Sequence, residues 1–375
     1  MPPEAVAAAT VVTLLAGGIA IVEFTLKPIR RYLMKRRDPT PATTEDIARV
    51  EAKLEELQKV TAAPPPGSPP VDTNALAEAA TERTEQLLTE ALELQRQHKE
   101  SEAIERLLTA YDMDMPPEAK ADLHILAGSG FLRLSELEEA EGHYRQALVA
   151  SERAGDRQAQ AAALAGLGLV HTDRGDLDSA ENHHRRALAM NEEIGNEVGK
   201  ATDLGNLGNV YHLRGDLDNA ETYHKRALAI AEELGYRLGQ ACDLGNLGSV
   251  YGDRSDLDRS EEYHTRALAL DREIGNERGR AQDLANLATV YGRRGDIGRA
   301  VEHFKRSVVI FEQIGDRLNN GLTLANLGTV YAKSGDLYAA EEHFREAVAL
   351  FENIGAQGHI ARTRRNIERL RTSNR

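Results

Sequence analysis

The sequence has little of what several common classes of protein require. Its single cysteine, Cys242, excludes a framework of disulfide bonds and indicates a reducing compartment, and the lack of any Asn-x-Ser/Thr sequence fits a chain that is not glycosylated. The formal net charge of −14 argues against a general nucleic-acid binder, because phosphate contacts need a positive surface. The chain has no Gly-x-x-x-x-Gly-Lys-Ser/Thr loop and no His-Glu-x-x-His motif. We therefore expect neither an enzyme nor a cofactor.

The chain is rich in internal repetition, with a period of 40 residues. One position of the repeat is occupied by Leu204, Leu244, Leu284 and Leu324. The copies begin near residues 121, 161, 201, 241, 281 and 321. A fixed period between about 20 and 50 residues is typical of stacked structural units. The sequence therefore predicts a stack of six units in place of one globular core.

Each unit has the pattern of two amphipathic helices joined by a tight turn. In the copy that starts at Ala201, the first helix has a buried stripe made of Leu204, Leu207, Gly208 and Tyr211. The second helix buries Ala220, His224, Ala227, Leu228 and Ile230. Gly208 costs about 1 kcal/mol inside a helix, so its recurrence predicts a closely packed neighbouring helix. Gly215 can end the first helix in the left-handed conformation, and Asp216 can cap the second.

These residues resemble the tetratricopeptide repeat, which has Leu-Gly-x-x-Tyr in its first helix, Gly-Asp in the turn, and small and aromatic positions in its second helix. The 40-residue length and the segment Leu-Gly-Asn-Leu-Gly are similar to the longer variant in kinesin light chains, in Pins/LGN polarity adaptors and in many bacterial proteins. The resemblance covers residues 121–355. It implies an all-α fold, an α-solenoid that forms a right-handed superhelix of stacked helix-turn-helix units.

The N-terminal part differs from the repeats. An uncharged run from Ala5 to Val22, extended to residue 26, is long enough to span a bilayer, so we expect a transmembrane anchor within residues 1–26. Basic side chains crowd residues 27–44, and the positive-inside rule then places the N-terminus outside and the repeats in the cytoplasm. A cleaved signal peptide is the alternative, and it would place the repeats in a periplasm or outside the cell.

Five further segments follow from composition and pattern. Residues 45–60 read as a short amphipathic, coiled-coil-like helix that supports at most weak homo-oligomerisation, and residues 61–75 are a Pro-rich linker. Residues 76–117 have the pattern of a degenerate tetratricopeptide-like helix pair. Residues 118–355 contain the six clear repeats, and residues 356–375 form a capping helix.

The strongest functional signal is a series of asparagines on the first helix of successive units, opposite the buried stripe. We call Asn206, Asn246, Asn286 and Asn326 the asparagine ladder. Asparagine is a mediocre helix former, whereas its amide offers both a donor and an acceptor. The resemblance implies that the first helices line a concave groove, where such asparagines hold the backbone of an extended peptide. Alternatively, the ladder is a passenger of recent duplication, or it bridges neighbouring helices.

Other residues of the same stripe complete the expected groove. Thr202, Asn209 and Gln282 are polar, whereas Arg293 and Lys333 favour an acidic side chain on the partner. Small residues such as Gly205 and Gly245 occupy the fifth position and leave room for a ligand backbone. Lysine is absent there, which is unlike the carboxylate clamp of chaperone-binding repeats.

Two tempting sites are better explained otherwise. The recurring histidines His143, His183, His184, His224, His264, His303 and His343 share their two positions with Tyr and Phe in other copies. We interpret them as packing residues and expect no metal site. Cys242 is expected on an exposed helix face without a partner that would activate it. The sequence thus predicts a membrane-anchored adaptor that binds a peptide segment of a partner protein. The alternatives are a self-assembling structural solenoid and a regulatory subunit of a signalling or enzyme complex.

Overall fold

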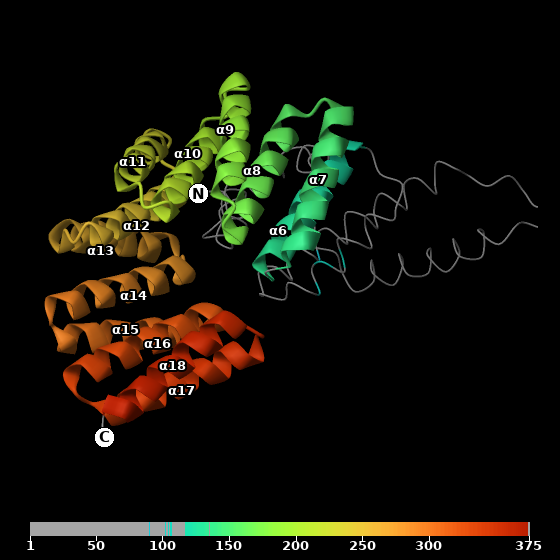
Figure 1. The fold of residues 1–375 in the computed structure, drawn as a ribbon. Helices are drawn as coiled ribbons and strands as arrows, with labels where there is room; N and C mark the ends of the chain where they lie inside the picture. The colour runs from blue at the N-terminus through green and yellow to red at the C-terminus, as the bar shows by residue number, and fades with distance from the viewer. Residues whose placement is uncertain are drawn as a thin grey trace, which may run out of the picture. The chain divides into compact units, whose positions relative to one another are not determined.

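The computed structural model describes residues 117–134 and 136–373, together with the separate positions 90, 102, 104 and 106. These residues form thirteen α-helices and no strand (Figure 1). The expected segments 1–26, 27–44, 45–60 and 61–75, and nearly all of 76–117, lie outside the described residues and stay predictions. Of the helices that are described, none combines the length and the apolar character that a bilayer crossing requires.

The chain divides into two compact units between Asp176 and Leu177. The first unit contains α6 (Pro117–Arg133), α7 (Leu137–Ala154) and α8 (Arg157–Arg174), and the three helices pack against one another. Tyr144 of α7 is fully buried beneath glycines of both neighbours. A Cβ atom at Gly166 would lie 2.2 Å from the ring of Tyr144, and one at Gly128 would lie 3.1 Å from it. The recurring glycines therefore give the close helix packing that the sequence predicts.

The second unit is a regular succession of ten helices. They are α9 (Leu177–Glu193), α10 (Glu197–Leu213), α11 (Leu217–Glu233), α12 (Arg237–Asp253), α13 (Leu257–Ile274), α14 (Glu277–Arg294), α15 (Ile297–Gln313), α16 (Arg317–Ser334), α17 (Leu337–Asn353) and α18 (Gln357–Ser373). Each helix packs against the next, and α10, α12, α14 and α16 also contact one another in succession. These four helices thus form one layer of a repeat solenoid. The predicted all-α solenoid is confirmed.

The turns between paired helices follow the chemistry that the sequence predicts. Gly215 has φ +79°, and the Asp216 carboxylate accepts a hydrogen bond of 3.1 Å from the backbone N–H of Asn219 at the start of α11. Ser255 replaces the glycine in one copy and still has φ +65°, the only positive φ at a described residue other than glycine. Arg293 donates to the Ser255 hydroxyl over 3.0 Å and to the Gly252 carbonyl over 2.5 Å, which fixes this turn.

The recurring histidine and aromatic positions fill packing slots, as predicted. His224 is fully buried, and a Cβ atom at Gly208 would lie 2.7 Å from its ring. At the other position Tyr223 stacks on Tyr211 of the preceding helix, with ring centroids 5.2 Å apart. Among the described residues no group of His, Cys, Asp and Glu has the arrangement of a metal site.

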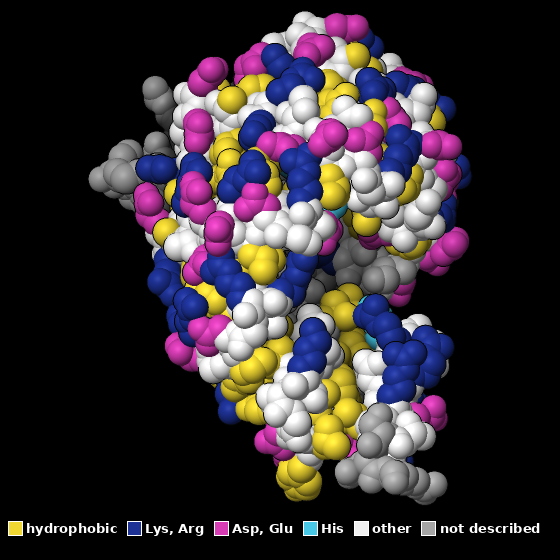
Figure 2. Space-filling view, turned by 60° about the vertical axis from the view of Figure 1, so that its left-hand side comes forward, with side chains coloured by type: hydrophobic (Ala, Val, Ile, Leu, Met, Phe, Trp, Pro, Cys, Tyr) yellow, Lys and Arg dark blue, Asp and Glu magenta, His cyan; other side chains and the backbone are white. Residues whose placement is uncertain are grey.

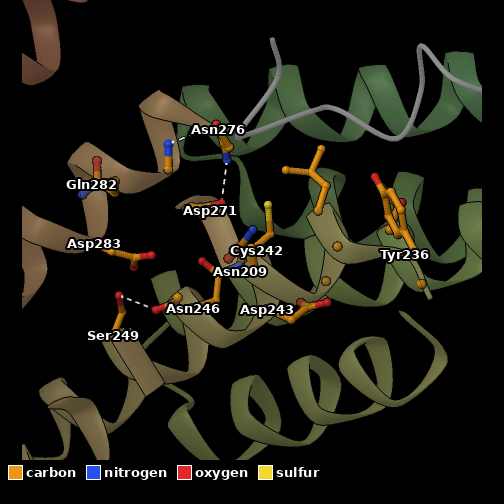
Figure 3. A pocket seen from close by; sticks show the side chains of 18 of the residues that line it. Asn209, Tyr236, Cys242, Asp243, Asn246, Ser249, Asp271, Asn276, Gln282 and Asp283 are labelled. Atoms are coloured by element: carbon orange, nitrogen blue, oxygen red, sulfur yellow. Dashed lines mark hydrogen bonds between the residues drawn. The ribbon is translucent and has the colours of Figure 1, made fainter. Parts of the chain in front are cut away.

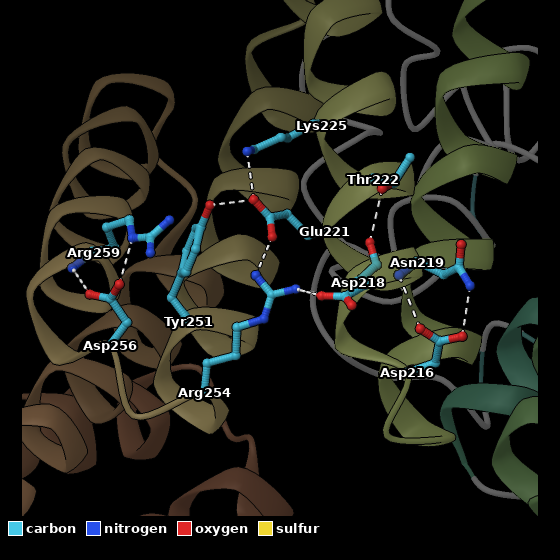
Figure 4. Close-up of polar contacts among 10 residues, drawn as sticks. All are labelled: Asp216, Asp218, Asn219, Glu221, Thr222, Lys225, Tyr251, Arg254, Asp256 and Arg259. Atoms are coloured by element: carbon cyan, nitrogen blue, oxygen red, sulfur yellow. Dashed lines mark hydrogen bonds and ion pairs between the residues drawn. The ribbon is translucent and has the colours of Figure 1, made fainter.

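An arginine near the end of α10, of α12 and of α14 joins each of these helices to the preceding repeat. Arg254 contacts Glu221 and Asp218 of α11, and the Tyr251 hydroxyl donates to Glu221 over 2.6 Å (Figure 4). Arg214 and Arg294 make the equivalent contacts one repeat before and one repeat after. We call this series the ion-pair ladder. Acidic and basic side chains lie beside each other over much of the face drawn in Figure 2.

The ion-pair ladder stops after Arg294. At the next rung all three positions have changed together, to Gly298, Val301 and Ser334. Apolar packing continues there, because Phe311 of α15 belongs to the same buried cluster as Leu327 and Val330 of α16. The repeats are therefore stacked throughout this unit but are cross-linked by charge only in part of it.

Candidate functional site

A cavity of about 360 Å³ opens on the layer formed by α10, α12 and α14 (Figure 3). Its walls come from these three helices, from Asp271 near the end of α13, and from the segments that lead into α12 and α14. Three members of the asparagine ladder line it, namely Asn206, Asn246 and Asn286. This volume falls within the range of about 300–1,000 Å³ typical of ligand pockets.

Six of the nine residues predicted for the groove meet at this cavity. Beside the three ladder residues they are Asn209, Thr202 and Gln282. The remaining three, Asn326, Arg293 and Lys333, do not line it. Asn326 and Lys333 are exposed on α16, whereas Arg293 uses its guanidinium to fix the turn at Ser255. A role of these nine residues in binding stays a prediction.

The amides of the cavity wall are only partly satisfied by the protein itself. Gln282 donates from Nε2 to Oδ1 of Asn286 over 3.3 Å. Asn206 is only 8% exposed, and its Nδ2 atom has no hydrogen-bond partner. A buried donor without a partner is costly, so a ligand acceptor at this place would be stabilised.

Three aspartates give the cavity its charge. Asp243, Asp271 and Asp283 line it, and none of its twenty lining residues, all of them described, is Lys, Arg or His. Asp243 Oδ1 lies 3.1 Å from Nδ1 of the buried His224, and Asp283 Oδ1 lies 3.1 Å from Nδ1 of the buried His264. These two aspartates therefore belong both to the packing between repeats and to the wall of the cavity.

Burial dominates the protonation of these groups. It raises the pKa of Asp243 and of Asp283, and in Asp271 burial and the neighbouring charge of Asp283 raise the pKa from 3.8 to about 7. Asp271 and Asp283 affect each other's pKa, and since both pKa values are raised, the pair favours retaining a proton. Burial lowers the pKa of His264 to about 4, which keeps this imidazole neutral.

The small residues Gly205 and Gly245 line the cavity, and they also have a role that we did not expect. A Cβ atom at Gly205 would lie 3.1 Å from Asp243 Oδ1, and one at Gly245 would lie 3.3 Å from Asp283 Oδ1. The glycines thus make room for a carboxyl of the next repeat, and a ligand backbone is not their first neighbour. Where the fifth position is Ala285, the next copy has Thr323 in place of the aspartate.

Cys242 also differs from the sequence-based expectation. It is half-buried and lines the cavity, with its sulfur among the polar side chains of Figure 3. Burial and the charges of Asp243, Asp271 and Asp283 raise the pKa of its thiol. A protonated thiol is a poor nucleophile, so Cys242 contributes an uncharged side chain to the wall.

Sequence reasoning missed Asp271, Asn276 and Tyr236, which also line the cavity. Asp271 lies near the end of a second helix, and Tyr236 and Asn276 lie in the segments that lead into a first helix. The position of Asn276 is also polar in other copies, but its side chain there caps the following helix, as in Asp156, Asn196 and Asp316. One signal was available. Asp271 occupies the position at which other copies have Ala231 or Phe311, so a carboxyl there departs from the packing pattern.

Comparison with known families agrees with this architecture. The family model described as tetratricopeptide repeat matches residues 121–193, 201–273 and 277–353, which together make up more than half of the chain. The chain therefore belongs to the tetratricopeptide repeat family. A search of curated proteins found no match.

Several solved structures share the fold. A Rap protein complexed with competence and sporulation factor has a TM-score of 0.62 and 14% identity, covering 95% of this chain and 100% of that chain. The Rap conjugation gene regulator of plasmid pLS20, in complex with the Phr* peptide, has a TM-score of 0.62 and 15% identity, with 93% and 96% covered. Aspartyl phosphate phosphatase F from Bacillus subtilis has a TM-score of 0.57 and 14% identity, with 93% and 94% covered. At such low identities these similarities show the fold alone.

Proposed function

We propose that this chain is an adaptor that captures a peptide segment of a partner protein on the layer of α10, α12 and α14. The observation that carries the proposal is that Asn206, Asn246 and Asn286, from three successive repeats, line one cavity. An amide supplies a donor and an acceptor, which matches the alternating groups of a peptide backbone. The unpartnered Nδ2 of Asn206 is one donor that such a backbone would satisfy.

The solved structures add support of a weaker kind. The Rap protein and the pLS20 regulator described above are each bound to a factor or peptide, in a fold that this chain shares. The factor and the peptide are ligands of those two proteins, and they do not identify a ligand of this chain. The cavity geometry remains the main argument, because it consists of residues of this chain.

We propose in addition that residues 5–26 anchor the chain in a membrane, with the repeats on the cytoplasmic side. The uncharged run and the basic residues that follow it support this topology. Extraction of cell membranes with alkaline carbonate tests it, because an anchored chain stays in the pellet with an intact N-terminal mass. A chain that is released, or one that lacks its first residues, contradicts the proposal.

The test of peptide capture compares affinity purifications of the full chain in detergent. Asn246 and Asn286 are changed together to alanine, and the matched control is Asn182→Ala, an exposed asparagine of α9. We expect a partner protein with the wild type and the control, and its loss from the double variant, with circular dichroism confirming that all three are folded. Equal profiles, together with concentration-dependent oligomers, would instead favour the self-assembling solenoid.

A further inference from the structure

Two equivalent buried positions of the repeat, 80 residues apart, have different polar side chains with different partners. In α9 Asn191 donates from Nδ2 to Asp203 Oδ2 over 2.7 Å and accepts from Asn196 over 2.8 Å. In α13 the equivalent residue is Asp271, which accepts from Asn276 over 2.9 Å and faces the carboxyl of Asp283. The first arrangement pairs one carboxyl with an amide donor. The second places two carboxyls together and needs a proton.

Helix stacking does not require the carboxyl of Asp271. The same position is Ala231, Phe311 and Phe351 in other copies, and all three are buried there. A buried carboxyl beside a second one is among the costlier groups in a protein interior, unless a cation or a proton compensates it. Asp271 is only 3% exposed, and a function outside packing would account for its presence.

Among the residues that the structure describes, none supplies a cation to this pair. The cavity wall contains Asp243, Asp271 and Asp283 but no basic side chain. Of the basic residues next to the wall in sequence, Lys200 pairs with Glu197 at 3.4 Å, Arg237 with Glu273 at 3.7 Å and Arg280 with Glu277 at 2.9 Å. Arg272 follows Asp271 but is exposed on α13 and does not line the cavity. An acidic wall alone does not establish a ligand site.

A second observation points to a ligand independently of charge. Asn206 lines the same cavity, is more than nine-tenths buried, and has no partner for its Nδ2 atom. A peptide placed in the cavity can satisfy both demands at once, with a carbonyl oxygen for Asn206 and a positive group for the carboxyls.

We propose that the cavity receives a cationic group of the bound peptide, an ammonium or a guanidinium, against Asp271 and Asp283. This inference rests on the proposed peptide capture and names the residue class that the pocket selects. The cation comes from a Lys or Arg side chain or from a free peptide N-terminus, and the two sources share the same chemistry. A cavity of about 360 Å³ has room for one such group with its adjoining backbone.

Proton release accompanies this binding. The cation favours ionised carboxyls, so the proton that Asp271 and Asp283 share is displaced to solvent when the peptide enters. The groups that face the pair are Asp243 and Cys242 of α12, His264 of α13 and Asn276 before α14, while His224 of α11 lies behind Asp243. Affinity for a cationic peptide therefore rises as the pH increases from about 6 to 8, through the raised pKa of Asp271 near 7.

The experiment uses the full 375-residue chain in detergent and hexapeptide libraries that each have one fixed residue. Acetylated libraries are fixed as Arg, Lys, Glu or Leu, and one library without Lys or Arg keeps its free N-terminus. The test variant is Asp271→Asn, which recreates the amide–carboxyl arrangement of Asn191 and Asp203 and is therefore expected to fold. The matched control is Asp203→Asn, at the repeat position of Asp283 but outside the cavity lining. Both variants replace one buried carboxyl by an amide, so a general effect of removing a carboxyl affects both alike.

We expect the wild type and Asp203→Asn to prefer cationic libraries over the Glu and Leu libraries by at least about tenfold, as for a hydrogen bond to a charged group. Asp271→Asn should lose this preference while it still binds peptides. Enrichment of the acetylated Arg and Lys libraries identifies a side chain, and enrichment of the free-terminus library identifies the terminal ammonium. Equal binding of all libraries, or a preference that survives in Asp271→Asn, contradicts the proposed cation site but leaves the proposed peptide capture standing. If no library binds the wild type, peptide capture itself is wrong, and the inference with it.

Discussion

The carboxyl pair in the cavity should lower the stability of the protein in a pH-dependent way. Asp271 has its pKa raised from 3.8 to about 7, so its contribution is most favourable below pH 4 and is lost as the pH rises through 7. A shift of about three units corresponds to roughly 4 kcal/mol, which we take as an upper bound for the cost at pH 8. Asp271→Asn removes this cost and supplies a donor for Asp283.

The assay is thermal unfolding followed by circular dichroism, for the wild type and Asp271→Asn at pH 5 and pH 8. For a unit of about 200 residues each 1 kcal/mol shifts the Tm by about 2–4 °C, so we expect the variant to gain about 5–10 °C at pH 8 and much less at pH 5. The reciprocal change, Asn191→Asp, creates a second carboxyl pair with Asp203 and should lower the Tm more at pH 8 than at pH 5. Equal shifts of Asp271→Asn at the two pH values would refute the argument from buried charge.

Three further changes test the packing, the outer ion pairs and the turns by thermal unfolding. Gly208→Ala should lower the free energy of unfolding by about 1–3 kcal/mol, because the new Cβ atom meets the buried ring of His224 at 2.7 Å. The control Gly298→Ala, in open surroundings, should not destabilise the protein, and equal melting temperatures of the two variants would contradict the packing argument. Arg254→Ala should cost no more than about 1 kcal/mol, and the difference from the wild type should shrink at high salt, so a loss that salt leaves unchanged would rule out an ionic origin. Ser255→Gly should gain about 1 kcal/mol by relieving a positive φ of 65°, and a lower Tm would show that the serine hydroxyl outweighs this strain.

The parts of the fold that depend on local chemistry were predictable from the sequence. Gly215 and Asp216 act within one turn, and the close approach at Gly208 repeats with the same period as the helices. Because each repeat contacts mainly its neighbours, a local pattern was sufficient to predict the solenoid. The same reasoning placed three ladder asparagines on one face, and these meet at the cavity.

The parts that depend on contacts between different repeat positions were not predictable. Gly205 was taken for a place of ligand approach, but its neighbour is Asp243, which comes 38 residues later and belongs to the following repeat. Asp271 stands where other copies have residues as different as Asn191, Ala231 and Phe311, so no periodic pattern marks it. Its raised pKa depends on the neighbouring carboxyl of Asp283, which comes from the following repeat. Charge within the cavity is thus a property of the stack and cannot be deduced from one repeat.

The interrupted ion-pair ladder has a consequence for how the second unit opens. Arg214, Arg254 and Arg294 tie successive helices from α9 to α14, whereas the rung of Gly298, Val301 and Ser334 between α15 and α16 lacks this ion pair. In a solenoid the weakest junction between neighbours sets where cooperative unfolding breaks into separate segments. Helices α16 to α18 should therefore exchange their amide hydrogens sooner than α10 to α14. The C-terminal segment can then open and close while the cavity keeps its shape.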